Sequence, residues 1–366
     1  MKSARSVRIF TGISIGILTI SAVSALAFTT VTASIEKIDA FAGIDKRPEK
    51  KSSAINYLIV GSDTREGLTR AEQKELRVGS VKTAAGKRSD TMLLVHVSKS
   101  RDKAVIISIP RDSYALIPAH KNSAGKDIPA THSKINSSFN WGGAPLLIQT
   151  LEQMTNLKID HYVEINFVGF ARMVDSLGGI EVCTKRDIDD PKSHLVLPAG
   201  VHTLNGIEAL KYVRTREFDG LGDIGRMQRQ QAFMSSVVKK ATSLGVLLNP
   251  VTMTSFINSA LSAVTTDSGL NSSELIVLAK QLKSLSASNV RTLTVPLSDL
   301  NYYANGVTAS VLWDPVLAPQ LWDRLREDRA VVDEVTPSPS PSATKAEKPK
   351  IIDKFKTRTA EDNICR

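Results

Sequence analysis

Strand-like and helix-like segments alternate through most of this chain, and that alternation limits the folds open to it. Residues 55–60 (INYLIV) form a continuous apolar run, which is typical of a buried strand. Thr91–Val97 and Ala104–Ile109 are two further predicted strands, joined as a hairpin by a turn at residues 98–103. Later strands are predicted at Tyr162–Ile165, Ile180–Cys183 and Arg291–Val295. Helices are predicted at Pro145–Thr155, Phe167–Leu177, Arg226–Lys240, Pro250–Val264, Ser272–Ser284 and Val311–Leu325. The pattern indicates an α/β class with a mixed sheet.

The N-terminus predicts where this domain folds. Lys2, Arg5 and Arg8 precede an uncharged run from Ile9 to Ile35, which is long enough to span a bilayer. Basic residues on the short side of such a run keep that side in the cytoplasm, so the rest of the chain is expected outside. The segment Ala25–Ala27 also fits a signal-peptide cleavage site, but the length of the run favours a retained anchor. Both alternatives argue against a DNA-binding role.

Composition predicts where the folded domain begins and ends along the chain. Residues 36–53 are polar, and the stretch TPSPSPSATKAEKPK has no large apolar side chain with which to build a core. The predicted segments are a cytoplasmic tail (1–8), a transmembrane anchor (9–35), a stalk (36–53), an extracellular domain (54–331), a Pro/Ser linker (332–350) and a C-terminal tail (351–366).

The net charge of +10 suits a polyanionic partner such as nucleic acid, an anionic membrane surface or a phosphate-rich substrate. Because the domain is expected outside the cytoplasm, nucleic acid is disfavoured, and the membrane surface and the phosphate-rich substrate remain as candidate partners. Cys183 and Cys365, an even pair in an exported chain, can form a disulfide; the alternative is a small buried Cys183 and a free Cys365. The six histidines lie apart and match no zinc motif.

The stretch KYVRTREFDGLGDIGRMQRQQ, residues 211–231, is called the arginine turn here. It holds four arginines and two aspartates around three glycines: Arg214, Arg216, Arg226, Arg229, Asp219 and Asp223. If residues 212–216 are extended, Arg214 and Arg216 point to one side, and Arg226 and Gln230 share a face of the following helix. Guanidinium groups at a helix N-terminus suit phosphate oxygens. The alternative is a solvated basic loop, which so many charges around one turn disfavour.

Other candidate residues lie at the ends of the predicted strands. Asp63 follows the first strand and Asp90 precedes the second, so the two carboxylates can hold Mg²⁺ at one sheet edge; the alternative is that each caps a turn. Arg111 follows the third strand and can pair with Asp112. Lys134 lies at a helix start, where a lysine is electrostatically disfavoured, and this placement points to a function.

Seven motifs resemble the LytR–CpsA–Psr family and occur in the family's order: NYLIVGSDTR, RSDTMLLVHV, ISIPRDSY, SKINSSF, SLGGIEV, LNGIEALKYVRTRE and DIGRMQRQQ. The resemblance covers residues 55–240 and the anchor. It implies a three-layer α/β/α domain with a hydrophobic pocket for a polyprenyl chain. It also implies a membrane-bound transferase that moves a glycosyl phosphate from a polyprenyl-pyrophosphate carrier to a peptidoglycan hydroxyl, with Mg²⁺ as cofactor. Family members attach teichoic acids, capsule or arabinogalactan in this way.

Roles for individual residues follow from the same resemblance. Asp63 and Asp90 look like the metal ligands, and Arg226, Asp223 and Arg111 like the catalytic residues. The pyrophosphate-binding residues look like Arg65, Lys134, Arg214, Arg216 and Gln230. The base that accepts the acceptor's proton is Asp223 or, alternatively, Asp112. Ser137 departs from the small apolar residue usual in its motif. Residues with apolar faces that suit the lipid pocket, and suit a core equally, are Leu146, Leu147, Phe167, Phe170 and Met173.

Two other functions are alternatives to the transferase. A pyrophosphatase acting on the same carrier needs the same cations, with water in place of the sugar hydroxyl. A non-catalytic envelope-binding or regulatory protein does not need paired acids facing paired bases, so Asp63, Asp90, Arg111 and Arg226 argue against it.

Overall fold

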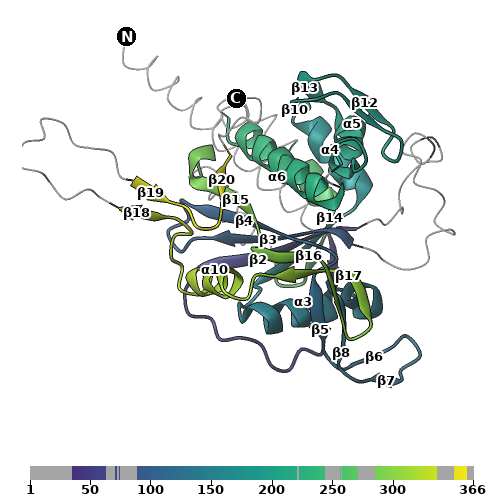
Figure 1. The fold of residues 1–366 in the computed structure, drawn as a ribbon, viewed down its shortest axis with the longest axis vertical. Helices are drawn as coiled ribbons and strands as arrows, with labels where there is room; N and C mark the ends of the chain where they lie inside the picture. Colours follow the sequence, from purple (N-terminus) through teal and green to yellow (C-terminus); the bar gives the residue numbers. More distant parts are fainter. Residues whose placement is uncertain are drawn as a thin grey trace, which may run out of the picture.

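A computed structural model describes residues 35–62, 71, 74, 89–220, 222–243, 256, 258–270, 285–335 and 350–360. Its centre is an eight-stranded sheet (Figure 1). In spatial order the strands are β1 (Glu36–Ile38), β14 (Val264–Asp267), β9 (His161–Ile165), β2 (Ile55–Ser62), β3 (Ser89–Val97), β4 (Ala104–Ile109), β15 (Val290–Thr294) and β20 (Arg358–Thr359). β2, β3 and β4 are antiparallel neighbours, whereas β9 runs parallel to β2 and β15 parallel to β4. The predicted hairpin and the mixed sheet are therefore confirmed.

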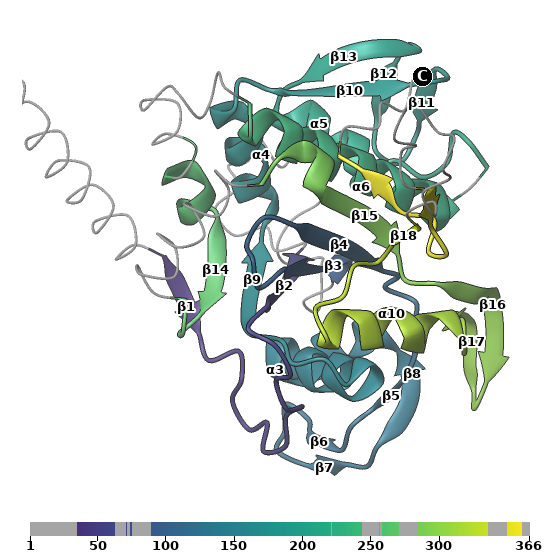
Figure 2. The same cartoon turned by 90° about the vertical axis from the view of Figure 1, so that its left-hand side faces the viewer.

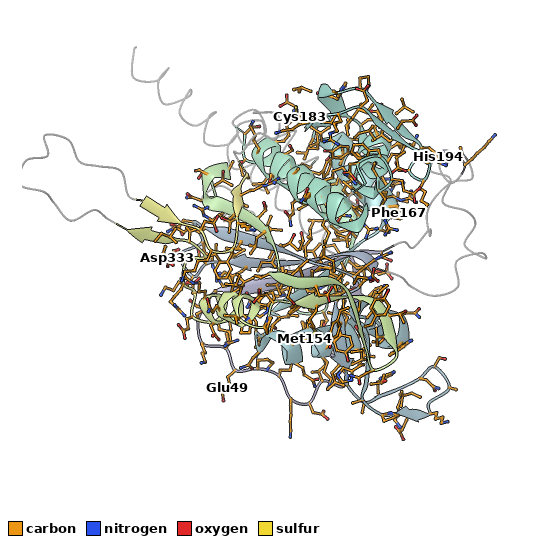
Figure 3. All side chains as sticks on the ribbon, in the orientation of Figure 1. Glu49, Met154, Phe167, Cys183, His194 and Asp333 are labelled. Atoms are coloured by element: carbon orange, nitrogen blue, oxygen red, sulfur yellow. The ribbon has the colours of Figure 1, made fainter. Side chains whose placement is uncertain are left out.

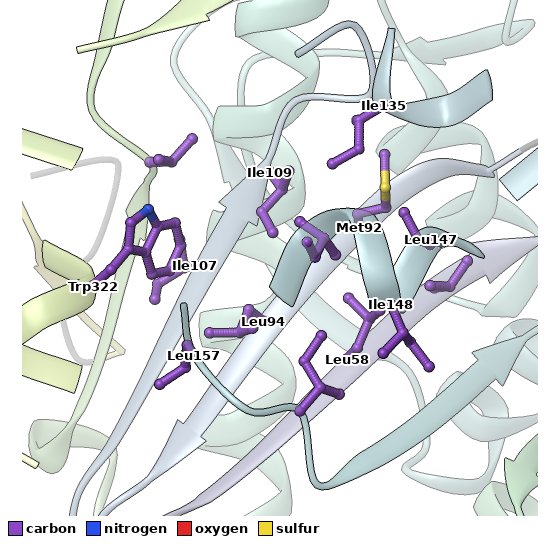
Figure 4. Packing of buried hydrophobic residues seen from close by; sticks show 14 of the residues in the cluster. Leu58, Met92, Leu94, Ile107, Ile109, Ile135, Leu147, Ile148, Leu157 and Trp322 are labelled. Atoms are coloured by element: carbon purple, nitrogen blue, oxygen red, sulfur yellow. The ribbon is translucent and has the colours of Figure 1, made fainter. Parts of the chain in front are cut away.

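Helices cover both faces of this sheet. In Figure 1, α4 (Phe167–Ser176), α5 (Gly206–Arg214) and α6 (Gly222–Ala241) lie on one face, and α3 (Ile135–Thr155) and α10 (Leu317–Arg326) on the other. Alternating strand residues separate the two cores. Leu58, Leu94 and Ile107 pack against α3 and α10, where Figure 4 shows Leu147 and Trp322 over the strands. The neighbouring residues on the opposite face pack against α6.

Two-stranded ribbons complete the fold (Figure 2). They are β10 (Ile180–Thr184) with β13 (Gly200–Leu204), β11 (Ile188–Asp190) with β12 (Leu195–Leu197), β5 (Tyr114–Ile117) with β8 (Thr131–Lys134), β6 (His120–Lys121) with β7 (Asp127–Ile128), β16 (Leu297–Ala304) with β17 (Val307–Trp313), and β18 (Asp333–Val335) with β19 (Lys350–Ile352). The β5–β8 and β16–β17 ribbons lie next to each other, because Ser113 and Val311 form a bridge between them.

Segments at both ends of the described chain pack into the domain. β1, from the expected stalk, is one edge of the sheet. Arg47 follows it and binds the buried Glu152 of α3, with Nη2 2.6 Å from Oε1. β20 forms the opposite edge, and Phe355 is buried in the main core. None of the helices in the described ranges is both long enough and apolar enough to cross a bilayer; the predicted anchor, apart from Ile35, lies outside those ranges.

The structure corrects three predicted elements. The helix predicted at Val311–Leu325 begins only at Leu317, because residues 307–313 form β17. The helix predicted at Pro250–Val264 stops before Val264, where β14 begins. Residues 212–216 are mostly helical rather than extended, since α5 continues to Arg214. The helix predicted at Ser272–Ser284 lies outside the described residues.

Candidate functional site

The arginine turn connects α5 to α6. A capping box of Asn205 and Glu208 begins α5, and Thr215 leaves the helix in an extended conformation. Gly220 and Gly222 then adopt positive φ angles of 73° and 52°, which side chains rarely allow. Helix α6 begins at Gly222, four residues earlier than predicted. Arg226 therefore lies in the second turn, and the free N–H groups of the helix start belong to residues before it.

Asp190 holds the extended part of the turn in place. Its Oδ2 accepts the backbone N–H groups of Arg216 and of Glu217, the latter at 2.8 Å, and its Oδ1 accepts those of Lys192 and Ser193 at 2.8 Å each. Burial alone would raise the pKa of Asp190, but these four donors stabilise the carboxylate and the net pKa lies below 3.8. Sequence reasoning missed this residue. The Asp-Asp-Pro sequence at 189–191 is a common turn sequence and by itself does not indicate the four N–H groups that Asp190 binds.

The side chain of Arg229 makes contacts within the arginine turn itself. Its Nη1 donates to Asp219 Oδ2 and its Nη2 to the carbonyl oxygen of Thr215, each at 2.5 Å. Its guanidinium also lies over the ring of Phe218, 4.8 Å from the centroid. Arg229 thus ties α6 to Thr215 and Asp219 in the loop between α5 and α6. The sequence alone did not separate it from the other three arginines.

The remaining arginines of the turn differ in their surroundings. Arg226 is buried, with 3% of its surface exposed. Arg214 lies at the end of α5, with its guanidinium 5.1 Å from the ring centroid of Phe167 at the start of α4. Figure 3 shows Phe167 in the layer that α6 also occupies. Arg214, Arg216 and Arg226 thus lie on three successive segments, the end of α5, the following loop and the second turn of α6.

Two glutamines join α6 to the strand ends. Gln230 Nε2 donates to Thr91 Oγ1 at 3.0 Å and to the carbonyl oxygen of Val213 at 3.1 Å. Gln231 Nε2 donates to Ser108 Oγ at 3.1 Å and to Thr294 Oγ1 at 2.6 Å. Because Met92 pairs with Ile109, Thr91 lies level with Pro110, the residue before Arg111. Gln230 thus connects the arginine turn to the end of β4.

A second group of charges stands at that strand end. Asp112 Oδ2 lies 3.6 Å from Arg111 Nε, and its Oδ1 lies 3.4 Å from Lys134 Nζ. Lys134 comes directly before α3, whose first N–H groups donate to the backbone oxygens of Ser113 and Arg111. All three charged side chains are partly exposed. The predicted Arg111–Asp112 pair is present, and the carboxylate is shared with Lys134.

Only the backbone can be described for the predicted metal ligands. Asp63 and Arg65 lie outside the described residues, and so do the side chains of Asp90 and Asp223. Asp90 lies on β3 between Thr91, which pairs with Gly61, and Ser89, which pairs with Ser62; the register shifts there. This register shift places the backbone of Asp90 at the end of the β2–β3 pair where β2 ends at Ser62. Within the described ranges, no set of three potential metal-binding side chains occurs.

The residues expected to line a lipid pocket do not form one group. Leu146 and Leu147 are buried in α3 on one face of the sheet, whereas Phe167, Phe170 and Met173 belong to α4 on the other. A cavity of about 330 Å³ does lie between α6 and β10, bordered by Tyr212, Ser235 and Lys239 among others. It lies toward the C-terminal end of α6, away from Arg226.

Cys183, on β10 beside this cavity, is bonded in a disulfide (Figure 3 labels it). The sequence has one other cysteine, Cys365, which lies outside the described residues. The structure therefore supports the disulfide alternative for Cys183.

Comparison with known proteins identifies the family. The model of the LytR_cpsA_psr family matches residues 22–322. The chain belongs to this family. It is 37% identical over 275 residues to the "probable cell wall biosynthesis protein LcpB" of Corynebacterium glutamicum, which covers 75% of this chain and 62% of LcpB. It is 34% identical over 203 residues to the "polyisoprenyl-teichoic acid–peptidoglycan teichoic acid transferase TagT" of Bacillus subtilis, covering 54% of this chain and 55% of TagT.

Solved structures agree on the fold of this LytR_cpsA_psr protein. A LytR-Csp2A-Psr enzyme from Actinomyces oris superposes with a TM-score of 0.59 at 22% identity, covering 80% of this chain and 95% of that one. TagT bound to LIIa-WTA superposes with a TM-score of 0.56 at 25% identity, covering 79% and 98%. The chain spans only about half to three-fifths of the length of the curated relatives LcpB and TagT.

Proposed function

We propose that this chain transfers a glycosyl phosphate from a polyprenyl-pyrophosphate carrier to a hydroxyl of peptidoglycan. The observation that supports the proposal is a hydrogen bond from Gln230 to Thr91, which relates two cationic groups near one end of the sheet. Arg214, Arg216 and Arg226 lie in the arginine turn. Arg111 follows β4 and Lys134 ends β8, and Asp112 contacts both. Gln230 of α6 donates to Thr91, which lies level with Pro110, the residue before Arg111. A pyrophosphate diester carries about two negative charges, which such groups stabilise. The relative TagT, named a teichoic acid–peptidoglycan transferase, supports the same class of reaction.

The reaction breaks one phosphorus–oxygen bond and forms another. The acceptor oxygen attacks the phosphorus that carries the glycan, and polyprenyl phosphate leaves with the electrons of the broken bond. Arg226, which is buried in the second turn of α6, stabilises charge on the transferred phosphoryl group. Arg214, Arg216 and Lys134 hold the carrier. Asp223 accepts the hydroxyl proton. Asp112 serves this role less well, because Arg111 and Lys134 already occupy its carboxylate.

Magnesium is the proposed cofactor. Asp63 and Asp90 would hold it. Asp63 is the next residue in the sequence after β2, Asp90 lies at the register shift of β3 opposite the end of β2, and Mg²⁺ commonly takes one or two carboxylates. When bound, the ion neutralises phosphate charge. A titration of the full chain with Mg²⁺, followed by intrinsic fluorescence, tests this without an activity assay. We expect a saturable change in the parent and a weaker response in Asp90→Asn.

A transfer assay separates the proposed reaction from its two alternatives. The full chain is used, because β1 and β20 lie in the central sheet. It is incubated with a polyprenyl-pyrophosphate-linked glycopolymer, with and without a peptidoglycan fragment. We expect a covalent polymer–peptidoglycan product that requires the fragment. Free glycan phosphate formed equally without the fragment indicates a pyrophosphatase, and carrier binding without turnover indicates a non-catalytic protein.

We also propose that the chain is a single-pass membrane protein with its domain outside the cell. The basic residues before the uncharged run at 9–35 support this orientation. A reporter that works only outside the cytoplasm, fused after Arg366, should be active. Activity of a cytoplasm-specific reporter at the same position would refute the orientation.

A further inference from the structure

One face of the β5–β8 ribbon runs directly from the proposed phosphate site to a group of aromatic rings. Tyr114 pairs with Lys134 across the ribbon, and Leu116 pairs with His132. Since strand side chains alternate between faces, these four share one face, and Ala115 on the other face is buried in the core. Lys134, at the inner end, contacts Asp112. The aromatic residues therefore continue the surface on which Lys134 lies.

Three rings on this surface form the aromatic platform, defined as Tyr114, His132 and Tyr302. The rings of Tyr114 and His132 are stacked, with centroids 5.0 Å apart and planes 9° from parallel. Tyr302, from the β16 strand, packs edge-on against Tyr114 at 5.1 Å. Asn305 Nδ2 donates to Tyr114 Oη at 2.5 Å. All three residues are partly exposed, so the platform lies at the surface of the domain, and Asn305 adds a hydrogen-bonding group beside it.

The β16–β17 hairpin that supplies Tyr302 is fixed to the proposed active site. Val311 N–H donates to the carbonyl oxygen of Asp112 at 2.8 Å, and Trp313 Nε1 donates to Ser113 Oγ at 2.9 Å. Its turn is also well defined, because Asn305 and Gly306 both have positive φ and Ala304 pairs with Val307. Figure 2 shows the hairpin projecting from the domain next to β5 and β8. These two hydrogen bonds thus fix the hairpin that carries Tyr302 to the segment that carries Asp112.

We propose that the aromatic platform binds the acceptor's glycan strand and presents it to the phosphate site. This inference rests on the proposed transfer to peptidoglycan. A pyranose ring has an apolar C–H face and a rim of hydroxyl groups, which match an aromatic face bordered by Tyr, His and Asn side chains. A phosphate-rich donor polymer would need cations along the platform, whereas the hairpin, residues 297–313, has no lysine or arginine and carries the exposed acid Asp299. Charge therefore favours the acceptor over the donor polymer.

Binding of a defined saccharide tests this assignment. The probe is the tetramer of β-1,4-linked N-acetylglucosamine, an uncharged strand of pyranose rings, titrated into the full chain by calorimetry. Tyr302→Ala should weaken its binding about tenfold, as expected for the loss of one ring contact. Tyr303→Ala is the matched control, because Tyr303 is the neighbouring, 58% exposed tyrosine of the same strand and makes no ring contact within the described part of the chain. This control should bind like the parent.

Four results of these titrations would overturn or reassign the proposal. Failure of the parent to bind the tetramer overturns the proposal, as does unchanged binding by Tyr302→Ala. Equal losses in Tyr302→Ala and Tyr303→Ala would reveal a distorted hairpin and also overturn it. A poly(glycerol phosphate) that binds the parent and loses affinity in Tyr302→Ala would assign the platform to the donor instead.

A third ligand distinguishes this proposal from the proposed function. Polyprenyl pyrophosphate should bind Tyr302→Ala as tightly as it binds the parent. If the parent binds the tetramer but not polyprenyl pyrophosphate, the transferase proposal fails while the saccharide platform stands. In the transfer assay, Tyr302→Ala should raise the KM for the peptidoglycan fragment about tenfold with little change in kcat. A fall in kcat at unchanged KM would contradict a role in acceptor binding.

Discussion

Asp190 Oδ2 accepts the backbone N–H of Glu217 at 2.8 Å, and through this contact one carboxylate on β11 sets the path of the arginine turn. The same oxygen accepts the N–H of Arg216. A buried acid far from the turn in sequence thus fixes where the backbone of the proposed phosphate site lies.

Asp190→Asn should destabilise the domain. The amide has one oxygen in place of two and points N–H groups at backbone N–H groups, so we expect a loss of about 2–3 kcal/mol in the free energy of unfolding at pH 7. Since the folded pKa of Asp190 lies below 3.8, its stabilising effect is complete above that value and is lost as the pH falls through the folded pKa. Urea unfolding across pH should show parent and variant converging in acid. A difference that stays constant down to pH 2 would contradict this account.

Asp219→Ala should leave the guanidinium of Arg229 buried without its carboxylate. Both side chains are largely buried, at 9% and 12% exposed, so we expect a loss of about 3 kcal/mol. Asp127→Ala is the matched control, because its pair with Lys121 is exposed and should contribute less than about 1 kcal/mol. Denaturant unfolding of both variants measures the difference. Equal effects would mean that the Arg229–Asp219 pair does not hold the turn.

Arg226→Lys should reduce kcat by roughly a hundredfold or more, because an ammonium group does not supply the planar fork of a guanidinium. The loss should appear in kcat rather than in KM for the carrier, as for an interaction made in the transition state. Arg186→Lys, at an exposed arginine outside the turn, is the control and should transfer like the parent. A folded Arg226→Lys variant with parental kcat would remove Arg226 from the mechanism.

Thiol labelling tests the disulfide of Cys183. The unreduced, denatured chain should contain no reactive thiol, and reduction should release two. A cross-link that closes so long a loop typically stabilises a domain by about 2–4 kcal/mol, so reduction should lower the melting temperature. Two thiols labelled before reduction would show that the pair does not form.

Local patterns predicted much of the fold but little of what holds the site together. The β3–β4 hairpin and most of helix α6 followed from residue periodicity, because neighbours in sequence determine them. Asp190 and Arg229 were different, since their partners are set by tertiary packing. The β16–β17 hairpin was predictable: Asn305-Gly306 is a strong turn signal that was overlooked.

The pairing of β20 with β15 has a consequence for the handling of this protein. β20 is two residues long and comes near the end of the chain, yet it covers the last edge of the central sheet together with the bond from Ala360 N–H to the oxygen of Val290. A chain shortened before Arg358 would offer the unpaired backbone of β15 to any extended segment it meets. We therefore expect such truncated chains to aggregate through the exposed edge of the sheet, even though they lack no residue of the proposed active site.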